Sequence, residues 1–181
     1  PRPALAPYVD ALFAYTSRAP GPEERRELPV PRAVLVVNLG PPLWIRQGGR
    51  WQAFPDGLLA GMDDLSVFTG TRTGLQEGVQ ALLTPLGCQR LAGVAMHELA
   101  HRSFPLEDVL GAPWREIVER MHGTTSWRTR LVLLEDALAA RVLEARAAPP
   151  DVVWAWERLE RAHGTVPVAA LAAELRCSER H

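Results

Sequence analysis

The chain has 181 residues, of which 47% are hydrophobic and 23% are charged, and its formal net charge is −1. This composition is typical of a globular protein with one or two domains, and the lack of a basic excess excludes broad phosphate binding by this segment. No apolar run approaches the roughly 20 residues that span a bilayer, and the start shows no signal-peptide pattern, so we expect a cytoplasmic location.

The first part of the chain, up to about Val94, is predicted to be all-β, because Gly and Pro separate short apolar runs throughout it. The candidate strands are 33–39, 43–46, 50–54, 58–60, 65–69 and 79–83. Gln-Gly-Gly at 47–49 is a hairpin signal, since glycine tolerates positive φ. This spacing of short strands predicts a small β-barrel or jelly roll over residues 1–104.

From about residue 105 the apolar period changes from two to 3.6, which predicts helices over 113–122 and 126–146. The longer helix carries an apolar stripe formed by Trp127, Leu131, Leu134, Leu138 and Val142. Charged residues lie largely off this stripe, namely Arg128, Arg130, Glu135, Asp136 and Arg141. The stripe fits either a helix packed on its own domain or a helix that pairs two copies. Residues 105–148 are accordingly predicted to be a helical linker and dimerisation segment.

Ala-Ala-Pro-Pro at 147–150 predicts a hinge, because two prolines end the long helix. Helices are expected again over 150–163 and 168–175. Within residues 165–181, small Ala172 and Ala173 allow close helix crossing, Leu171 and Leu175 are core anchors, and Ser178 is placed to cap a following helix. This arrangement is what a helix-turn-helix requires.

Residues 165–181 resemble the first helix-turn-helix of AraC-family transcription regulators. Residues 87–111 look like the junction of one AraC subfamily, where a β-rich domain is followed by helices, and Leu-Val-Val-Asn-Leu-Gly at 35–40 adds to the resemblance. The resemblance implies an α+β chain with an N-terminal cupin-like β-barrel that senses a small-molecule effector, followed by helices that form a homodimer. It also implies that residues 149–181 begin a DNA-binding domain and stop just inside its first recognition helix.

The resemblance assigns contacts with promoter DNA to Ser178, Arg180 and His181 in the complete protein, and it implies no cofactor. One position departs from the pattern, because the residue after Leu175 is commonly glycine in the family and is Arg176 here. Glycine suits a left-handed residue after a helix, and arginine there costs on the order of 1 kcal/mol. We therefore expect a strained or slightly different turn at Arg176.

The candidate effector-binding residues are the large aromatic residues on predicted strands together with one arginine: Trp44, Arg46, Trp51, Phe54 and Phe68. Alternation places Trp44 and Arg46 on the same face of their strand, where an inward Arg46 would meet an anionic ligand. The competing interpretation is that aromatic residues on strands simply fill the core.

His-Glu-Leu-Ala-His at 97–101 supplies the alternative function, a zinc metalloprotease with His97 and His101 as ligands and Glu98 as general base. Such a site needs a stable helix and a third ligand, yet Gly93 and Pro105 leave room for only a short helix. We therefore expect the match to be accidental and the chain not to be an enzyme.

No metal site is predicted elsewhere. A cupin-type site would need histidines on the barrel strands, and all five histidines lie at or after position 97. Cys88 and Cys177 are far apart and indicate neither a disulfide framework nor a thiolate site.

Overall fold

The computed structural model describes residues 1–178 and divides into two compact units, Pro1–Ala145 and the segment that begins at Arg146. Within the described residues, the first unit contains all the strands and the first helices, and the second unit contains two helices. No helix of residues 1–178 is long and apolar enough to cross a membrane.

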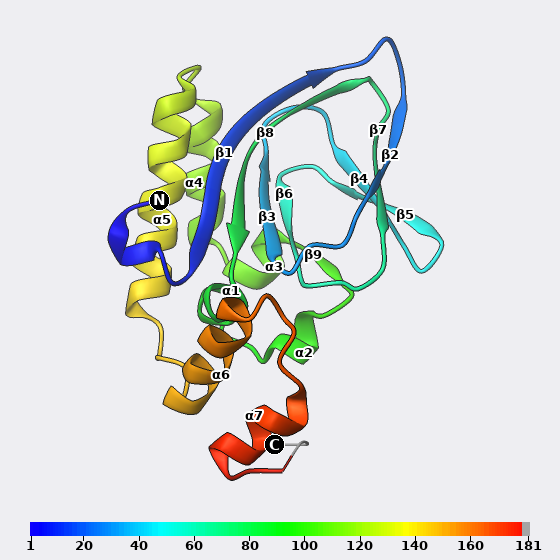
Figure 1. Ribbon diagram of the computed structural model, residues 1–181. Coiled ribbons are helices and arrows are strands. Elements are labelled where there is room, and N and C mark those ends of the chain that lie inside the picture. The colour runs from blue at the N-terminus through cyan, green and yellow to red at the C-terminus, as the bar shows by residue number, and fades with distance from the viewer. Residues whose placement is uncertain (179–181) are drawn as a thin grey trace. The chain divides into compact units, whose positions relative to one another are not determined.

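The first unit contains two antiparallel sheets that face each other (Figure 1). The five-stranded sheet has the order β1 (Val9–Arg18), β8 (Leu75–Leu83), β3 (Ala33–Asn38), β6 (Gly57–Ala60) and β9 (Ser103–Pro105). The four-stranded sheet has the order β2 (Glu23–Glu27), β7 (Val67–Thr71), β4 (Leu43–Gln47) and β5 (Arg50–Phe54). The prediction of an α+β chain with a β-rich N-terminal part is therefore confirmed.

The strands are wound as a long antiparallel ribbon folded over on itself. β1 pairs with β8, β2 with β7, β3 with β6 and β4 with β5, and successive pairs alternate between the two sheets. Among the described residues no ladder joins the two sheets, so the predicted barrel is not closed. Prolines stand at two of the corners between the sheets, at 20 and 22 and at 41 and 42, where they cannot donate to a ladder.

The helices of the first unit lie against one face of the five-stranded sheet. They are the 3-10 turn η1 (Pro3–Leu5) and the helices α1 (Pro85–Ala92), α2 (Met96–Leu99), α3 (Leu106–Leu110), α4 (Pro113–His122) and α5 (Trp127–Glu144). α5 lies beside β1 and β8 and packs against α1 and α4 (Figure 1). The sequence-based reading missed α1, which lies in the part predicted to be all-β. The Thr84 side chain caps its start by accepting from Gly87 N, and Gly93, at φ 74°, ends it.

Two hydrophobic clusters form the core of this unit. The larger lies between the five-stranded sheet and the helices, and its fully buried side chains include Leu35, Val37, Val79, Leu83, Leu91, Met121, Leu134 and Leu138. The smaller lies between the sheets and consists of Val36, Leu43, Ile45, Phe54 and Leu58. The five-stranded sheet is therefore covered on both faces, whereas the outer face of the four-stranded sheet carries none of these clustered residues.

The apolar stripe of α5 packs on its own unit. Leu134, Leu138 and Val142 are 0% exposed, and Trp127 and Leu131 pack against the same cluster. For these residues, the interpretation of the stripe as the face of a helix packed on its own domain therefore holds. The homodimer stays a prediction, and any pairing through α5 would have to use outward residues such as Val132 and Leu143, which are 43% and 48% exposed.

The second unit contains α6 (Pro150–Arg161) and α7 (Val168–Leu175). Leu171 and Ala172 of α7 are buried as expected, whereas Leu175, also expected to be a core anchor, is half-buried and Ala173 is exposed. Arg176, which follows α7, has φ 53° and ψ 38°, so arginine does occupy the left-handed position that was expected to be strained.

Candidate functional site

The outer face of the four-stranded sheet is built by strict alternation along β4. Leu43 and Ile45 point into the core between the sheets, so Trp44 and Arg46 lie on the opposite, outer face. Pairing with β5 and β7 extends this face, because Trp51 and Phe68 both stand opposite Arg46. Four of the five predicted effector residues are thus neighbours.

Gly70 of β7 makes room for Trp51 in the middle of this face. Gly70 stands opposite Trp44, and a Cβ added to it would lie 3.4 Å from Cη2 and Cζ3 of the Trp51 ring. The Trp51 indole therefore reaches across β4 and its far edge lies over Gly70. A Cβ alone would already lie 3.2 Å from the Glu23 carbonyl oxygen, and a side chain larger than alanine would have to push the indole aside, which gives the glycine a specific role in the site.

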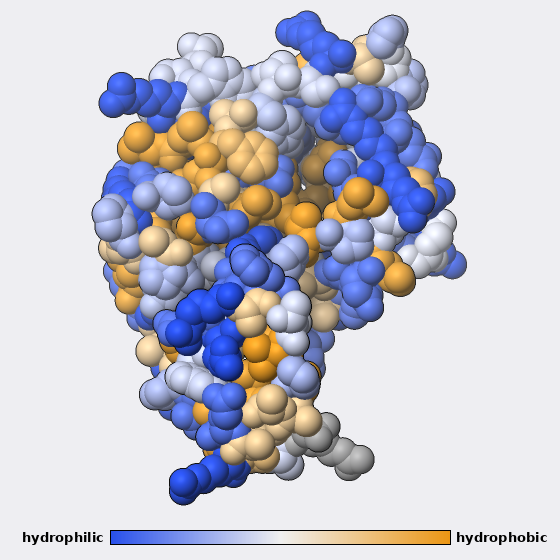
Figure 2. All heavy atoms as spheres, in the orientation of Figure 1, coloured by the Kyte–Doolittle hydropathy of each residue, from blue (hydrophilic) through white to orange (hydrophobic). Residues whose placement is uncertain are grey.

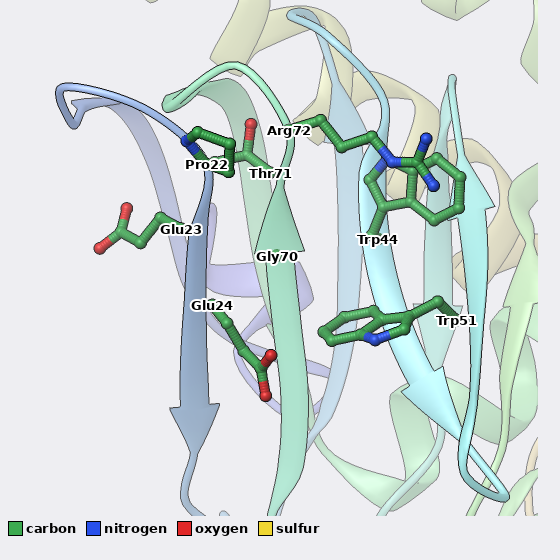
Figure 3. Close-up of a pocket in the computed structure, with 8 residues that line it drawn as sticks. All are labelled: Pro22, Glu23, Glu24, Trp44, Trp51, Gly70, Thr71 and Arg72. Atoms are coloured by element: carbon green, nitrogen blue, oxygen red, sulfur yellow. The ribbon is translucent and has the colours of Figure 1, made fainter.

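A hollow of about 330 Å³ lies on this face (Figure 3). Its lining residues are Pro22, Glu23, Glu24, Trp44, Trp51, Gly70, Thr71 and Arg72. Figure 3 shows the Arg72 side chain reaching over Trp44 and the Glu24 carboxylate directed toward Trp51, whereas Glu23 points away. The hollow therefore presents two indoles with one guanidinium and one carboxylate beside them.

The charged groups of this face are held by aromatic rings and by ion pairs. The Arg72 guanidinium lies 3.8 Å from the centre of the Trp44 ring, and the Arg46 guanidinium lies 3.9 Å from the centre of the Phe68 ring. Arg46 also pairs with Glu24, at 3.5 Å between Nη2 and Oε1. Figure 2 shows hydrophilic side chains gathered over β2 and β7.

The Glu23 carboxylate points away from the hollow and is paired with Arg25. Its carboxylate accepts from Arg25 Nε at 2.7 Å, and this hydrogen bond lowers the pKa of Glu23 below its usual value. Arg25 also donates to Ser17 Oγ of β1 at 2.7 Å, which places this pair between the sheets. Glu24 is therefore the carboxylate of the lining that faces the hollow.

The space between the sheets has a different character. Phe54, the fifth predicted effector residue, is 0% exposed there and packs with core residues, so it lies apart from the hollow. Tyr15 packs beside this cluster, and burial raises its pKa to about 12, with a smaller contribution from Glu27. Arg46 faces outward, so it does not offer the inward anion contact considered from the sequence.

Sequence reasoning missed Glu24, Gly70 and Arg72. Glu24 and Arg72 reach the hollow through the register of β2 with β7 and of β7 with β4. No local pattern predicts that pairing, because the segments are far apart in the chain. A usable signal was the alternation at 68, 70 and 72, which places Phe68, Gly70 and Arg72 on one face once β7 is recognised.

The His97 to His101 motif does not form the helix that a zinc peptidase needs. α2 ends at Leu99, Ala100 is extended at ψ 140°, and His101 is left-handed at φ 59°. Two histidines four apart bind one zinc only when a continuous helix places them on one face. The structure thus speaks against the metalloprotease alternative.

His101 instead pairs with the loop that follows β6. Its Nδ1 lies 3.0 Å from Asp63 Oδ1 and 3.5 Å from Asp64 Oδ1. The hydrogen bond with Asp63 raises the pKa of His101. Burial raises the pKa of Asp63, but hydrogen bonds from His101 and from the Leu65 backbone outweigh it, so the net shift is downward.

These three side chains form a group of potential metal ligands, with their ligand atoms within 4.8 Å of one another. Asp64 and His101 are exposed, and neither His97 nor Glu98 belongs to the group. A second hollow of about 330 Å³ is lined by Glu98 and by Arg102, Phe104 and Asp108 among others, again without either histidine of the motif. The peptidase combination of two histidines and a base is therefore not assembled.

We expect Glu98→Gln to behave as a surface substitution. Glu98 is exposed, and its one described contact is a long hydrogen bond, 3.4 Å, from Ala95 N. The free energy of unfolding should change by no more than about 0.5 kcal/mol in a denaturant titration, as is usual away from special contacts. Purified protein should also hold no stoichiometric zinc by elemental analysis. Bound zinc, together with peptide cleavage that Glu98→Gln abolishes, would contradict this.

Of the predicted DNA-contacting residues, the structure describes Ser178, which is exposed and follows the left-handed Arg176. Arg180 and His181 lie outside the described residues. The turn after α7 is thus described up to the residue that would cap a recognition helix.

Comparison with known proteins assigns no family to this chain. No protein-family model matches the chain, and no curated protein matches it. Among solved structures, the AraC-like transcriptional activator CuxR is similar with a TM-score of 0.38 and 14% sequence identity, over 99% of this chain and 80% of that chain. At this TM-score the similarity identifies neither a family nor a fold.

Proposed function

We propose that this chain is the regulatory part of an AraC-type transcription regulator, acting in the cytoplasm. The observation that carries the proposal is the turn after α7. Leu171 and Ala172 are buried, and Arg176 is left-handed at the position where the resembling family commonly has glycine. A helix-turn-helix needs this sharp turn so that its second helix can cross the first.

The first unit supports the same proposal. Strands that alternate between two facing sheets and pair as a folded ribbon are typical of jelly rolls, which include the cupins. A cupin-like domain followed by helices and a hinge is the organisation that the resemblance implies. In this proposal residues 1–104 form the sensor, 105–148 the helical linker with a role in homodimer formation, and 149–181 the start of the DNA-binding domain.

The effector site in this proposal is the hollow on the outer face of the four-stranded sheet. Trp44 and Trp51 line it, and Arg46 and Phe68 adjoin it. Phe54 supports the sheet from the core side. Binding pockets are commonly apolar with a few placed polar groups, and two indoles with Glu24 and Arg72 fit that description.

DNA contact is assigned to Ser178, Arg180 and His181 within the complete recognition helix. In the complete protein we expect Arg180→Ala to weaken binding of a DNA site selected from a random pool by about 5- to 150-fold, because a base-contacting arginine is typically worth roughly 1–3 kcal/mol. Residues 1–181 alone should show no sequence-selective binding. Fluorescence anisotropy at one fixed salt concentration measures both.

Arg161→Ala is the matched control, because it removes one exposed arginine from α6, outside the turn. It should leave sequence preference intact. If Arg161→Ala and Arg180→Ala reduce the affinity for the DNA site equally, Arg180 contributes only general electrostatic attraction. Tight, sequence-selective binding by residues 1–181 would contradict the proposal.

A further inference from the structure

The outer face of the four-stranded sheet is positively charged, although the whole chain has a formal net charge of −1. Register places three arginines on this face, namely Arg26, Arg46 and Arg72, and the facing carboxylate is Glu24. Arg26 stands opposite Phe68, and Glu24 stands opposite Gly70. The face therefore has an excess of guanidinium groups around its aromatic rings.

We infer that the hollow binds a small molecule with a planar aromatic ring and an anionic group. This inference rests on the proposed function, because it names the chemical class of the effector. The ring would lie against the Trp51 indole, beside the Trp44 indole that carries the Arg72 guanidinium, and the anionic group would accept hydrogen bonds from Arg72. Two classes of small molecule combine such a ring with such a group, namely aromatic carboxylates and mononucleotides.

Arg72 is the residue that the geometry assigns to the anion. Its guanidinium is stacked on Trp44, and within the described residues no carboxylate pairs with it. Because the N–H donors of a guanidinium lie in its plane, stacking fixes the group and leaves its edge available for a carboxylate or phosphate. Arg46 is already paired with Glu24, so Arg72 is the cation with unused donors in the hollow.

Trp51 is the residue that the geometry assigns to the ring. It is 39% exposed although it is a large aromatic residue, and its indole is supported over Gly70. Stacking on an exposed indole is favourable for any planar ring and is insensitive to ring type. A hollow of about 330 Å³ is sufficient for a molecule of one or two rings.

The test uses residues 1–181 and four probes in isothermal titration: adenosine monophosphate, adenosine, benzoate and benzamide. At least one anionic probe should bind about tenfold or more tightly than its neutral partner, as charge-assisted hydrogen bonds are roughly twice as strong as neutral ones. Comparing the affinities for adenosine monophosphate and for benzoate shows whether the site prefers a mononucleotide or an aromatic carboxylate. If neither anionic probe binds more tightly than its neutral partner, the inference is wrong.

Variants then locate the site. Arg72→Gln should reduce binding of the preferred anionic probe by about tenfold or more while binding of the neutral partner stays unchanged. Trp51→Leu should weaken both members of the pair, and Gly70→Val should do the same by displacing the indole. Circular dichroism melting checks that each variant is folded.

Arg102→Gln is the matched control, because Arg102 is also an exposed arginine stacked on an aromatic ring, that of Phe104 at 4.6 Å. The Arg102→Gln variant should bind each probe with the same affinity as the wild type. If Arg72→Gln also binds as the wild type does, the inference fails. Because these titrations contain no DNA, probe binding without any DNA recognition by the complete protein would refute the proposed function and leave this inference standing.

Discussion

Leu134→Glu should unfold the first unit rather than separate two copies. Leu134 is 0% exposed within α5 and belongs to the cluster that joins the helices to the five-stranded sheet. The substitution removes a buried leucine side chain and places a carboxylate in the apolar cluster, where the nearest buried cation on the helix, Arg130, is already paired with Glu77. The combined cost exceeds about 4–5 kcal/mol, which approaches the roughly 5–15 kcal/mol of total stability typical of a domain.

Val132→Glu is the matched control on the same helix, because Val132 is 43% exposed. Its free energy of unfolding should stay within about 0.5 kcal/mol of the wild type. Urea titration followed by circular dichroism measures both variants, and sedimentation reports their association. A Leu134→Glu protein that unfolds cooperatively at the wild-type midpoint and differs only in sedimentation would show that the stripe pairs two copies after all.

The strands with strong local signals were predictable. The candidates at 33–39, 43–46 and 50–54 correspond to β3, β4 and β5, and the Gln-Gly-Gly turn holds Gly48 and Gly49 at φ 53° and 79°. Apolar alternation and positive-φ glycines are properties of a few adjacent residues, so they can be read without knowing the fold.

Elements with weaker local patterns were missed. β1 is a long strand with mixed polarity, and it is defined by its register with β8, which lies more than fifty residues later. α1 did have a local signal, because Thr84 and Pro85 begin it and Gly93 ends it. The preceding strand-like run at 79–83 concealed that signal.

The site was predictable in part. Alternation correctly placed Trp44 and Arg46 on one face, but alternation alone does not say which face is inner. Leu43 and Ile45 decide that question, because the more apolar side of a strand packs on the core. Glu24 and Arg72 depend on strand order, which is a property of the whole sheet.

Arg130 shows how a charged residue can be misplaced by a sequence pattern. It was expected largely off the apolar stripe of α5, yet it is 7% exposed. Its position four residues before Leu134 puts it on the buried side of the helix. The guanidinium makes three contacts there: Nη1 lies 3.1 Å from Glu77 Oε1, Nε donates to the Met121 carbonyl at 3.2 Å, and the group lies 4.5 Å from the centre of the Trp127 ring.

Arg130→Ala should therefore destabilise the first unit by about 2–4 kcal/mol. The variant removes the described donor to the Glu77 carboxylate and one donor to the Met121 carbonyl, which keeps a hydrogen bond of 3.4 Å from Thr124 N. Full burial of both groups would cost more, but the Glu77 side chain is 25% exposed, so water offsets part of the loss. Urea titration gives the free energy of unfolding.

Arg2→Ala is the control for a surface ion pair, because Arg2 contacts Glu135 and Asp136 of the same helix while 48% exposed. It should cost less than about 1 kcal/mol, as exposed pairs usually do. Glu77→Gln should lie between the two variants, since an amide still accepts a hydrogen bond from Arg130 but loses the charge. If Arg130→Ala costs no more than Arg2→Ala, then Arg130 does not join α5 to β8 energetically, and the apolar cluster alone holds α5 against the five-stranded sheet.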